Sequence, residues 1–178
     1  DSWLMYPNYR WIYNKLQICQ FQKVMHAPMP VEPSRDHYPI ILKPIINLYG
    51  MGLGSHKINN EDEFYDHWQN TGFWMRFLEG EHISIDMAVR DGVVKWRSTF
   101  VGHYRNDVLG AFDYWETDDR SLPESIERFL EHLNDYTGFL NVECINGTMI
   151  ECHLRIGDAD QIPDEKFRKA VVDFYSSG

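Results

Sequence analysis

A segment near the C-terminal end of the chain, residues 148–155, alternates polar with apolar side chains. In an extended strand, successive side chains point to opposite faces, so Glu151, His153 and Arg155 share one face while the apolar set faces the core. The strand before it places Glu143 on a polar face in the same way. The sequence therefore predicts a β-hairpin that presents two carboxylates, an imidazole and a guanidinium.

The link between these two strands decides whether the glutamates lie on the same face. A two-residue Asn-Gly turn would pair Val142 with Glu151, whereas an odd number of loop residues brings Glu143 opposite Glu151. We therefore expect a three-residue loop with Gly147 in a bulge. Paired carboxylate oxygens suit Mg²⁺ or Mn²⁺, so a magnesium site is one hypothesis and a solvated strand face is the other. Zinc binding by His153 is a weaker hypothesis, because no Cys or His accompanies it at the spacing of a zinc site.

Glycines at alternate positions follow a lysine in the first third of the chain. Lys43 ends a short, proline-bounded strand over 38–44, and Gly50, Gly52 and Gly54 come next. Glycines let backbone N–H groups approach phosphates, but this spacing matches neither the P-loop nor the dinucleotide-binding motif. The loop by itself predicts only a flexible turn, and the nearby lysine adds the charge that an anion requires.

The remaining pattern predicts the elements that hold these residues. Strands are expected between Phe73 and Trp115, where apolar and polar residues alternate and Arg90-Asp91-Gly92 forms a turn. The expected helices span residues 9–26, 60–70, 121–136 and 164–175. Strands and helices mix without regular βαβ alternation, which favours an α+β fold over a doubly wound sheet.

Composition limits the partners of the chain. Its 178 residues carry 17 basic and 27 acidic side chains, a net charge of −10 that disfavours nucleic acid. No stretch reaches the length of a membrane span, no signal peptide opens the chain, and three cysteines predict reduced thiols. We therefore expect a cytoplasmic protein without membrane contact. The absence of an initiator Met is expected for a processed chain or a segment of a longer protein.

The collinear order of these motifs resembles the ATP-grasp fold family. The matching segments cover nearly the whole chain: Asn14-Lys15, Pro28-Met29-Pro30, Tyr38 to Pro44, Gly50 to Ser55, Trp74 to Leu78, Gly80 to Asp86, and Glu143 with Glu151 to Arg155. The resemblance implies two small α+β lobes that enclose a nucleotide cleft. It also implies an ATP-dependent ligase that activates a carboxylate as an acyl-phosphate for attack by an amine or a similar nucleophile.

The lobes implied by the resemblance have approximate boundaries in this sequence. Residues 1–35 would form an N-terminal helix and connector, and residues 36–78 a smaller lobe with the glycine-rich phosphate loop. Residues 79–178 would form a larger lobe with the metal-binding hairpin. Ligases of this fold carry an N-terminal domain that helps to bind the acceptor, so a missing domain or a partner chain would complete the site.

The resemblance further implies a role for each matching residue. The residues expected to bind ATP are Lys15, Lys43, Gly50, Gly52, Gly54, Ser55, Arg76, Phe77, Leu78 and Glu81. Glu143 and Glu151 would hold Mg²⁺ or Mn²⁺, and His153 stands where the family has a metal-ligating Asn. Lys43, Arg155 and Arg97 are the expected catalytic residues. The resemblance places Arg155 at the γ-phosphate or an acyl-phosphate, whereas Arg97 is expected, from its place on the strand over 93–100, to reach the phosphates or the acceptor carboxylate.

Two other functions remain open at this point. His153 in place of the family's Asn, Met75 near the adenine hinge and the missing N-terminal domain fit a nucleotide-binding protein that keeps the fold without ligation. Glu143, Glu151 and His153 together fit a divalent-metal hydrolase. Replacement of Glu151 by Ala separates these readings, because we expect it to abolish metal-dependent binding. We also expect the fold to survive that change, since the side chain is on the presented face.

Overall fold

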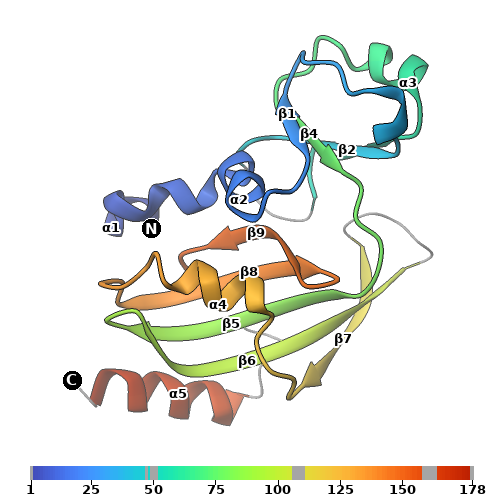
Figure 1. Ribbon diagram of the computed structural model, residues 1–178. Coiled ribbons are helices and arrows are strands. Elements are labelled where there is room, and N and C mark those ends of the chain that lie inside the picture. The colour runs from blue at the N-terminus through green and yellow to red at the C-terminus, as the bar shows by residue number, and fades with distance from the viewer. Residues whose placement is uncertain (1, 47, 49–51, 106–110, 158–163, 177–178) are drawn as a thin grey trace.

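Two antiparallel β-sheets organise the chain, one above the other in Figure 1. The computed structural model describes residues 2–46, 48, 52–105, 111–157 and 164–176. Both sheets are antiparallel and helices flank them, so the predicted α+β class is confirmed. None of the helices in these ranges is long and apolar enough to cross a membrane.

The smaller sheet has the strand order β1-β4-β2-β3. Its strands are β1 (His26–Pro28), β2 (Ile40–Lys43), β3 (His56–Ile58) and β4 (Phe73–Arg76). The short helices η2 (Arg35–His37) and α3 (Glu61–Asp66) lie between these strands in sequence. A small core of Ile40, Leu42, Ile58, Phe64 and Trp74 holds the unit together. Because β1 pairs with β4, the segment that we expected to be a connector contributes a strand.

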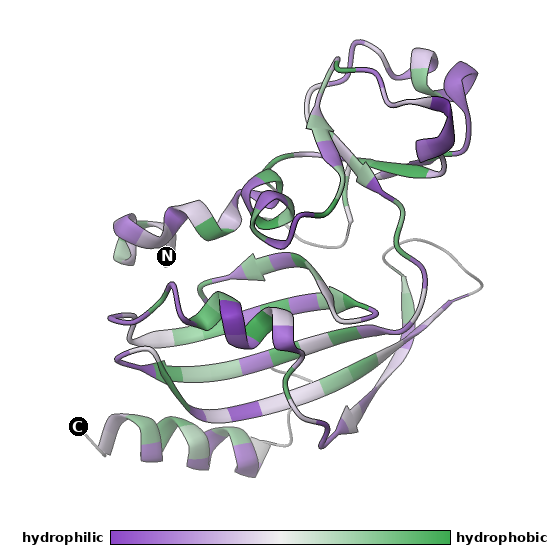
Figure 2. Ribbon diagram, in the orientation of Figure 1, coloured by the Kyte–Doolittle hydropathy of each residue, from purple (hydrophilic) through white to green (hydrophobic). Residues whose placement is uncertain are grey.

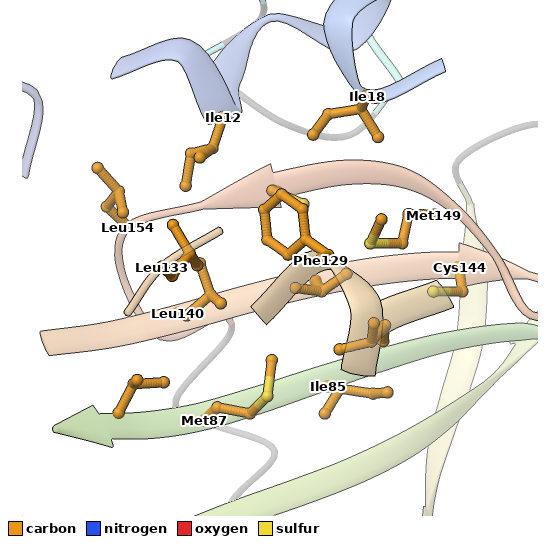
Figure 3. Packing of buried hydrophobic residues seen from close by; sticks show 14 of the residues in the cluster. Ile12, Ile18, Ile85, Met87, Phe129, Leu133, Leu140, Cys144, Met149 and Leu154 are labelled. Carbon is orange, nitrogen blue, oxygen red and sulfur yellow. The ribbon is translucent and has the colours of Figure 1, made fainter. Parts of the chain in front are cut away.

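The larger sheet has the strand order β7-β6-β5-β8-β9. Its strands are β5 (His82–Arg90), β6 (Val93–Tyr104), β7 (Phe112–Asp118), β8 (Gly138–Ile145) and β9 (Thr148–His153). Figure 3 shows one face of this sheet, where Phe129 and Leu133 pack with Ile12 and Ile18 against Met87 and its neighbours. Helix α4 (Glu124–Leu130) supplies part of that cover. The predicted strands after Phe73 are confirmed.

The opposite face of the larger sheet is covered at one end by α5 (Asp164–Ser176). Phe174 packs on Phe139 of β8, with ring centroids 5.3 Å apart. Figure 2 shows hydrophobic and hydrophilic residues alternating along this helix, and Val172 stays exposed while Phe174 is buried. The predicted helix over 164–175 is therefore confirmed. Toward the middle of this face Asp86 and Asn141 are also buried, and Asp86 accepts a hydrogen bond from the N–H of Gly157 at 2.7 Å.

The N-terminal segment differs from the single helix predicted over 9–26. It forms α1 (Ser2–Met5), the 3₁₀-helix η1 (Pro7–Tyr13) and α2 (Lys15–Gln22). The break falls at Asn14, whose Oδ1 accepts hydrogen bonds from the backbone N–H groups of Leu16 and Gln17 at 3.1 and 3.2 Å. An Asn that caps a new helix must itself leave helical geometry. Lys15 consequently occupies the first turn of α2.

Two other helices are shorter than predicted. Asn60 caps α3, since its side chain accepts from the N–H of Glu63, but the helix ends at Asp66 and not at residue 70. Helix α4 begins at Glu124 and ends at Leu130, whereas the prediction ran from residue 121 to residue 136. The residues that follow α4 still pack in the core, with Leu133 and Tyr136 fully buried. Apolar periodicity therefore predicted burial in this segment better than it predicted helix length.

Candidate functional site

Two adjoining cavities lie between the sheets. Each has a volume of about 430 Å³. They share five lining residues, which are Ile41, Lys43, Tyr104, Ile145 and Ile150. One cavity extends beneath the segment that joins the two sheets, and the other extends toward the hairpin of β8 and β9. We call the first cavity the apolar end, although Lys57, Arg76 and Glu79 also line it. The second cavity, which is lined by Lys15, Glu143 and Glu151, is the charged end.

The apolar end lies beneath the link between β4 and β5. Figure 1 shows this link running from the smaller sheet down to the larger one. It is fixed by two backbone hydrogen bonds, from Arg76 N–H to Met25 and from Phe77 N–H to Pro39, at 3.0 and 3.1 Å. The apolar side chains at this end are Ile41, Met75, Phe77, Leu78, Ile145 and Ile150. Such a slot beneath an exposed link accommodates a flat, largely apolar group.

The charged end depends on the register of the β8–β9 hairpin. Glu143 is paired with Glu151 across the strands, as predicted, but the predicted three-residue loop is wrong. The turn contains only Asn146 and Gly147, with φ angles of 47° and 76°, which a two-residue turn of this kind requires. The odd residue is instead a bulge at Ile150, because Cys144 pairs with Met149. The bulge also brings Ile150 to the cavity wall.

Glu151 forms a buried ion pair with Lys15. Oε2 of Glu151 lies 3.0 Å from Nζ of Lys15, and the two side chains are 10% and 4% exposed. Nε2 of His153 lies 3.1 Å from Oε1, which has no aligned hydrogen bond among the described residues. Burial raises the pKa of Glu151, but the neighbouring His153 and Lys15 outweigh it and lower the pKa to about 2. Glu151 is therefore ionised and is paired with the ammonium of Lys15.

This burial corrects the expectation that Glu151 can be replaced without cost. We expected a presented, solvated side chain, whereas Glu151 is 7% exposed and His153 is 3% exposed. Helix α2 and η1 pack over β9, and Tyr13 places its ring 5.8 Å from that of His153. Removal of the carboxylate would leave Lys15 buried without its counterion. The polar face of the hairpin is thus an interior surface of the site.

Lys43 lies at the same end without an anionic partner in contact. Its side chain lines both cavities, and no hydrogen bond or ion pair joins it to any residue in the described ranges. Burial, and secondarily the charge of Lys15, lowers the pKa of Lys43 to about 8. A buried cation that lacks a partner is expected to attract an anionic ligand into the cavity.

Glu143 is held by His82, which was not among the predicted site residues. Nε2 of His82 lies 3.0 Å from Oε2 of Glu143, and Nδ1 lies 2.8 Å from the hydroxyl of Tyr104. Burial and then the charge of Glu143 raise the pKa of Tyr104 to about 12, so the phenol keeps its proton. Alternation along β5 places His82 on the same face as Ser84 and Asp86, and this pattern was the available signal.

The glycine-rich segment reaches the site only in part. Gly52 and Ser55 line the charged cavity, and Ser55 donates its N–H to the carbonyl of Gly52 at 2.9 Å. Gly54 lines a separate apolar groove beside Pro44. Gly50 lies outside the described residues. The structure therefore brings two members of the predicted phosphate loop to the cavity.

Other predicted site residues lie away from the cavities. Glu81 pairs its carboxylate with Arg120 and lines neither of them. Arg97 is paired directly with Met87, so the two side chains share a face of the sheet. That face carries the core and is opposite to the face that carries Glu143. Arg155 is exposed and donates to the carbonyl of Ile156 at 2.9 Å. The structure therefore does not group these three side chains with the lysines and glutamates.

Glu143 and Glu151 could hold a divalent cation only together with another ligand, such as a phosphate group. Mg²⁺ is usually held by one or two carboxylates together with substrate phosphates. Glu143 and Glu151 both line the charged cavity, so they meet that requirement. His153 lines neither cavity, and no group of three His, Cys, Asp or Glu residues in the described ranges is arranged to hold a metal ion. This arrangement counts against the three-ligand hydrolase.

Comparison with known proteins identifies the fold. No family model and no curated protein sequence matches this chain. An L-amino acid ligase from Bacillus licheniformis superposes with a TM-score of 0.63 at 14% identity, covering 85% of this chain and 42% of that chain. An N5-carboxyaminoimidazole synthetase from Staphylococcus aureus, complexed with ADP, gives 0.63 at 15% identity, with 86% and 48% covered.

A third solved structure carries the fold in its name. An ATP-grasp superfamily protein from Archaeoglobus fulgidus gives a TM-score of 0.61 at 16% identity, covering 94% of this chain and 53% of that chain. The chain has the ATP-grasp fold, and it spans about half the length of these solved structures. The predicted resemblance and fold class are confirmed.

Proposed function

We propose that this chain binds ATP in the cavity between its two sheets, as the nucleotide-binding part of an ATP-grasp ligase. The observation that supports this most is the convergence of two lysines and two glutamates on one cavity, which adjoins a second cavity whose lining includes Met75, Phe77 and Leu78. A nucleoside triphosphate has the same division, with a flat base at one end and a charged chain at the other. The solved structures of the same fold include complexes with ATP and ADP.

In this proposal the base lies beneath the link at Arg76, Phe77 and Leu78. The apolar walls there gain contact when a ring displaces water, and burial contributes about 25 cal/mol for each Å² of apolar surface. Ile150 and Met75 belong to these walls. The link between the sheets would thereby determine where the base ends and where the phosphates begin.

The phosphates lie at the charged end, against Lys15 and Lys43. Lys43 supplies an ammonium that has no other partner there, and Gly52 and Ser55 add small polar groups on the same wall. Glu143 and Glu151 would hold Mg²⁺ or Mn²⁺ together with the phosphates, and the cation supplies neutralisation of the phosphate charge. Lys15 is paired with Glu151 in this structure, so it would have to leave that carboxylate in order to contact the phosphates.

The finer reaction that we propose is phosphorylation of a carboxylate by ATP, followed by displacement of phosphate by an amine or a similar nucleophile. The relevant support is that solved structures of this fold include an L-amino acid ligase and a D-alanine–D-alanine ligase. The acceptor is proposed to lie beside the charged cavity, near Arg105 and Trp115. A further domain or a partner chain would supply the rest of the acceptor site.

One observation favours a second candidate, a nucleotide-binding protein of this fold without ligase activity. Arg155 and Arg97 line neither cavity, although each was expected to act on the phosphates or the acceptor. The buried position of His153 beneath Glu151 points the same way, because it leaves only two ligands from the hairpin. Both candidates require nucleotide binding, and they differ in turnover.

The test is ADP release in the presence of Mg²⁺ and a panel of amino acids and small carboxylates. A ligase that forms an acyl-phosphate transfers ¹⁸O from a labelled carboxylate to inorganic phosphate, so mass spectrometry of the phosphate reports the reaction class. We expect label transfer with at least one carboxylate. ATP binding without stimulated ADP release or label transfer would favour the second candidate, and absence of nucleotide binding would reject both.

A further inference from the structure

His82 lies directly beneath one of the two glutamates. It is the first residue of β5 and only 5% of its surface is exposed. Both ring nitrogens have partners, since Nε2 lies 3.0 Å from Oε2 of Glu143 and Nδ1 lies 2.8 Å from the hydroxyl of Tyr104. A buried histidine with two occupied nitrogens is held in one orientation.

The chemistry of the partners decides which nitrogen of His82 carries a hydrogen. An ionised carboxylate only accepts hydrogen bonds, so Nε2 must donate to Glu143. In the neutral ring Nδ1 then accepts, and the hydroxyl of Tyr104 donates to it. Tyr104 retains its proton, because burial and the charge of Glu143 raise its pKa to about 12. The three side chains therefore form a directed chain of hydrogen bonds that ends at the carboxylate.

Aromatic rings confine His82 on its other sides. Phe112 and Trp115 meet it edge to face, with centroids at 4.9 and 5.8 Å. Gly102 is paired with His82 across β5 and β6, and a Cβ there would lie 2.6 Å from the ring of Phe112. The absence of a side chain at Gly102 thus makes room for the rings that enclose the imidazole. Rotation of His82 away from Glu143 would require these rings to move.

Glu143 and Glu151 differ in how many of their carboxylate oxygens already have a partner. Oε2 of Glu143 is occupied by His82, whereas Oε1 has no hydrogen bond to any residue in the described ranges. The side chain is 30% exposed and lines the charged cavity. Both oxygens of Glu151, by contrast, lie within 3.1 Å of a cationic or imidazole nitrogen. Glu143 is therefore the carboxylate that offers an open oxygen before any ligand binds.

We propose that His82 is a positioning residue for the divalent cation. By donating to one oxygen of Glu143 it orients the carboxylate and leaves the other oxygen for the cation. This rests on the proposed function, because it takes Glu143 as one of the groups that hold the cation beside the phosphates. Hydrogen-bond partners of metal ligands typically contribute 10–100-fold to metal affinity, so a measurable effect is expected.

The first test examines the hydrogen bond in the protein without metal or nucleotide. Long-range ¹H–¹⁵N correlation spectra of protein labelled at histidine nitrogens distinguish the two ring positions. We expect the resonance of His82 to show hydrogen on Nε2, and the assignment is made by its loss in the His82→Gln variant. A ring that carries hydrogen on Nδ1 alone would overturn the proposal, because Nε2 would then have nothing to donate.

The second test measures free Mn²⁺ by electron paramagnetic resonance, with adenylyl imidodiphosphate present at saturation. We expect His82→Leu to weaken Mn²⁺ affinity by about 10–100-fold. His82→Gln should retain most of the affinity, because its amide can still donate to Glu143. Tyr104→Phe should give a smaller loss, since it removes only the far end of the chain. His103→Leu is the matched control, because His103 contacts Glu116 outside both cavities.

The outcomes separate this inference from the proposed function. If the unaltered protein binds Mn²⁺ with the nucleotide and His82→Leu binds it equally well, only the role of His82 is overturned. If His82→Gln loses as much as His82→Leu, hydrogen bonding is not the cause and the role is again overturned. If the unaltered protein binds no Mn²⁺ with the nucleotide, both proposals fail. If circular dichroism shows that His82→Leu does not fold, His82→Gln and Tyr104→Phe decide the question. Equal Mn²⁺ affinity in the unaltered protein, His82→Gln and Tyr104→Phe would then overturn the role of His82.

Discussion

The two ends of the cavity are stabilised in different ways. At the apolar end the walls come from side chains such as Met75 and Ile150, and the link above them is fixed by its own backbone hydrogen bonds. At the charged end Lys15 and Glu151 neutralise each other, and His82 bonds to Glu143. A base can therefore enter one end by displacing water, whereas phosphates and a cation must exchange partners at the other. Substitutions at the two ends should differ accordingly in size and in sign.

The largest effect is expected for the buried pair at the charged end. Glu151→Gln should lower the free energy of unfolding by about 3–5 kcal/mol, because it leaves Lys15 buried without a counterion. Adding Lys15→Met should recover most of that loss. Urea denaturation at pH 7 measures both changes. Glu61→Gln is the control, since its pair with Arg35 is exposed and should contribute less than about 1 kcal/mol.

The same pair predicts how stability depends on pH. The folded pKa of Glu151 is about 2 and its ordinary value is 4.5, so the stabilisation is fully present above pH 4.5. It should be lost as the pH falls toward 2. An equal loss in the Glu151→Gln variant over this range would contradict the assignment, because that variant has no carboxyl group to protonate at this position.

Lys43 should behave in the opposite way to Glu151. Lys43→Met should weaken binding of an ATP analogue by about 100-fold, the effect expected when a buried charged contact is removed. It should nevertheless raise the free energy of unfolding by about 1–3 kcal/mol at pH 7, because the buried ammonium has no partner in contact. Calorimetry and urea denaturation together test this. A variant that is both less stable and equally tight in binding would show that Lys43 is structural.

The pKa of Lys43 gives a further prediction at the same end. Since that pKa is lowered to about 8, the ammonium loses its proton as the pH rises through 8. Affinity for the ATP analogue should fall above pH 8, by at most about tenfold for each pH unit. Lys43→Arg should remove this dependence, because arginine stays charged. An affinity that stays constant from pH 7 to 10 in the unaltered protein would contradict a role for Lys43 at the phosphates.

The smallest effect is expected at the apolar end. Ile150→Ala removes part of the wall and should weaken binding of the analogue by about 3–10-fold, with little change in its metal dependence. Val172→Ala, on the exposed side of α5, is the matched control and should leave the affinity unchanged. If Ile150→Ala has no effect, the base does not lie against the bulge of β9.

The sequence predicted which glutamates face each other at the charged end better than it predicted the local geometry around them. Alternation in the hairpin placed Glu143 opposite Glu151, because a period of two needs only local information. The bulge at Ile150 was missed, since it lies within an apolar run and leaves no signal in composition. Arg97 was expected to reach the phosphates or the acceptor, but the register of β6 on β5 pairs it with Met87 and places it on the core face of the sheet.

Burial was the other quantity that the sequence did not reveal. Charged residues on an alternating strand indicate a solvated face, and only the packing of α2 and η1 over β9 makes Glu151 and His153 interior. The break at Asn14 was also missed, because a polar residue in a helical pattern can equally well be a cap. His82 was missed as a site residue because its importance depends on a cross-strand contact with Glu143.

The central claim is that the cavity binds a nucleoside triphosphate together with a divalent cation. Calorimetric titration of the unaltered protein with adenylyl imidodiphosphate, first with Mg²⁺ and then with the chelator EDTA, tests this claim most directly. The account predicts one binding site per chain and a loss of affinity when Mg²⁺ is removed. Absence of binding, or binding that is equally tight without Mg²⁺, would contradict it.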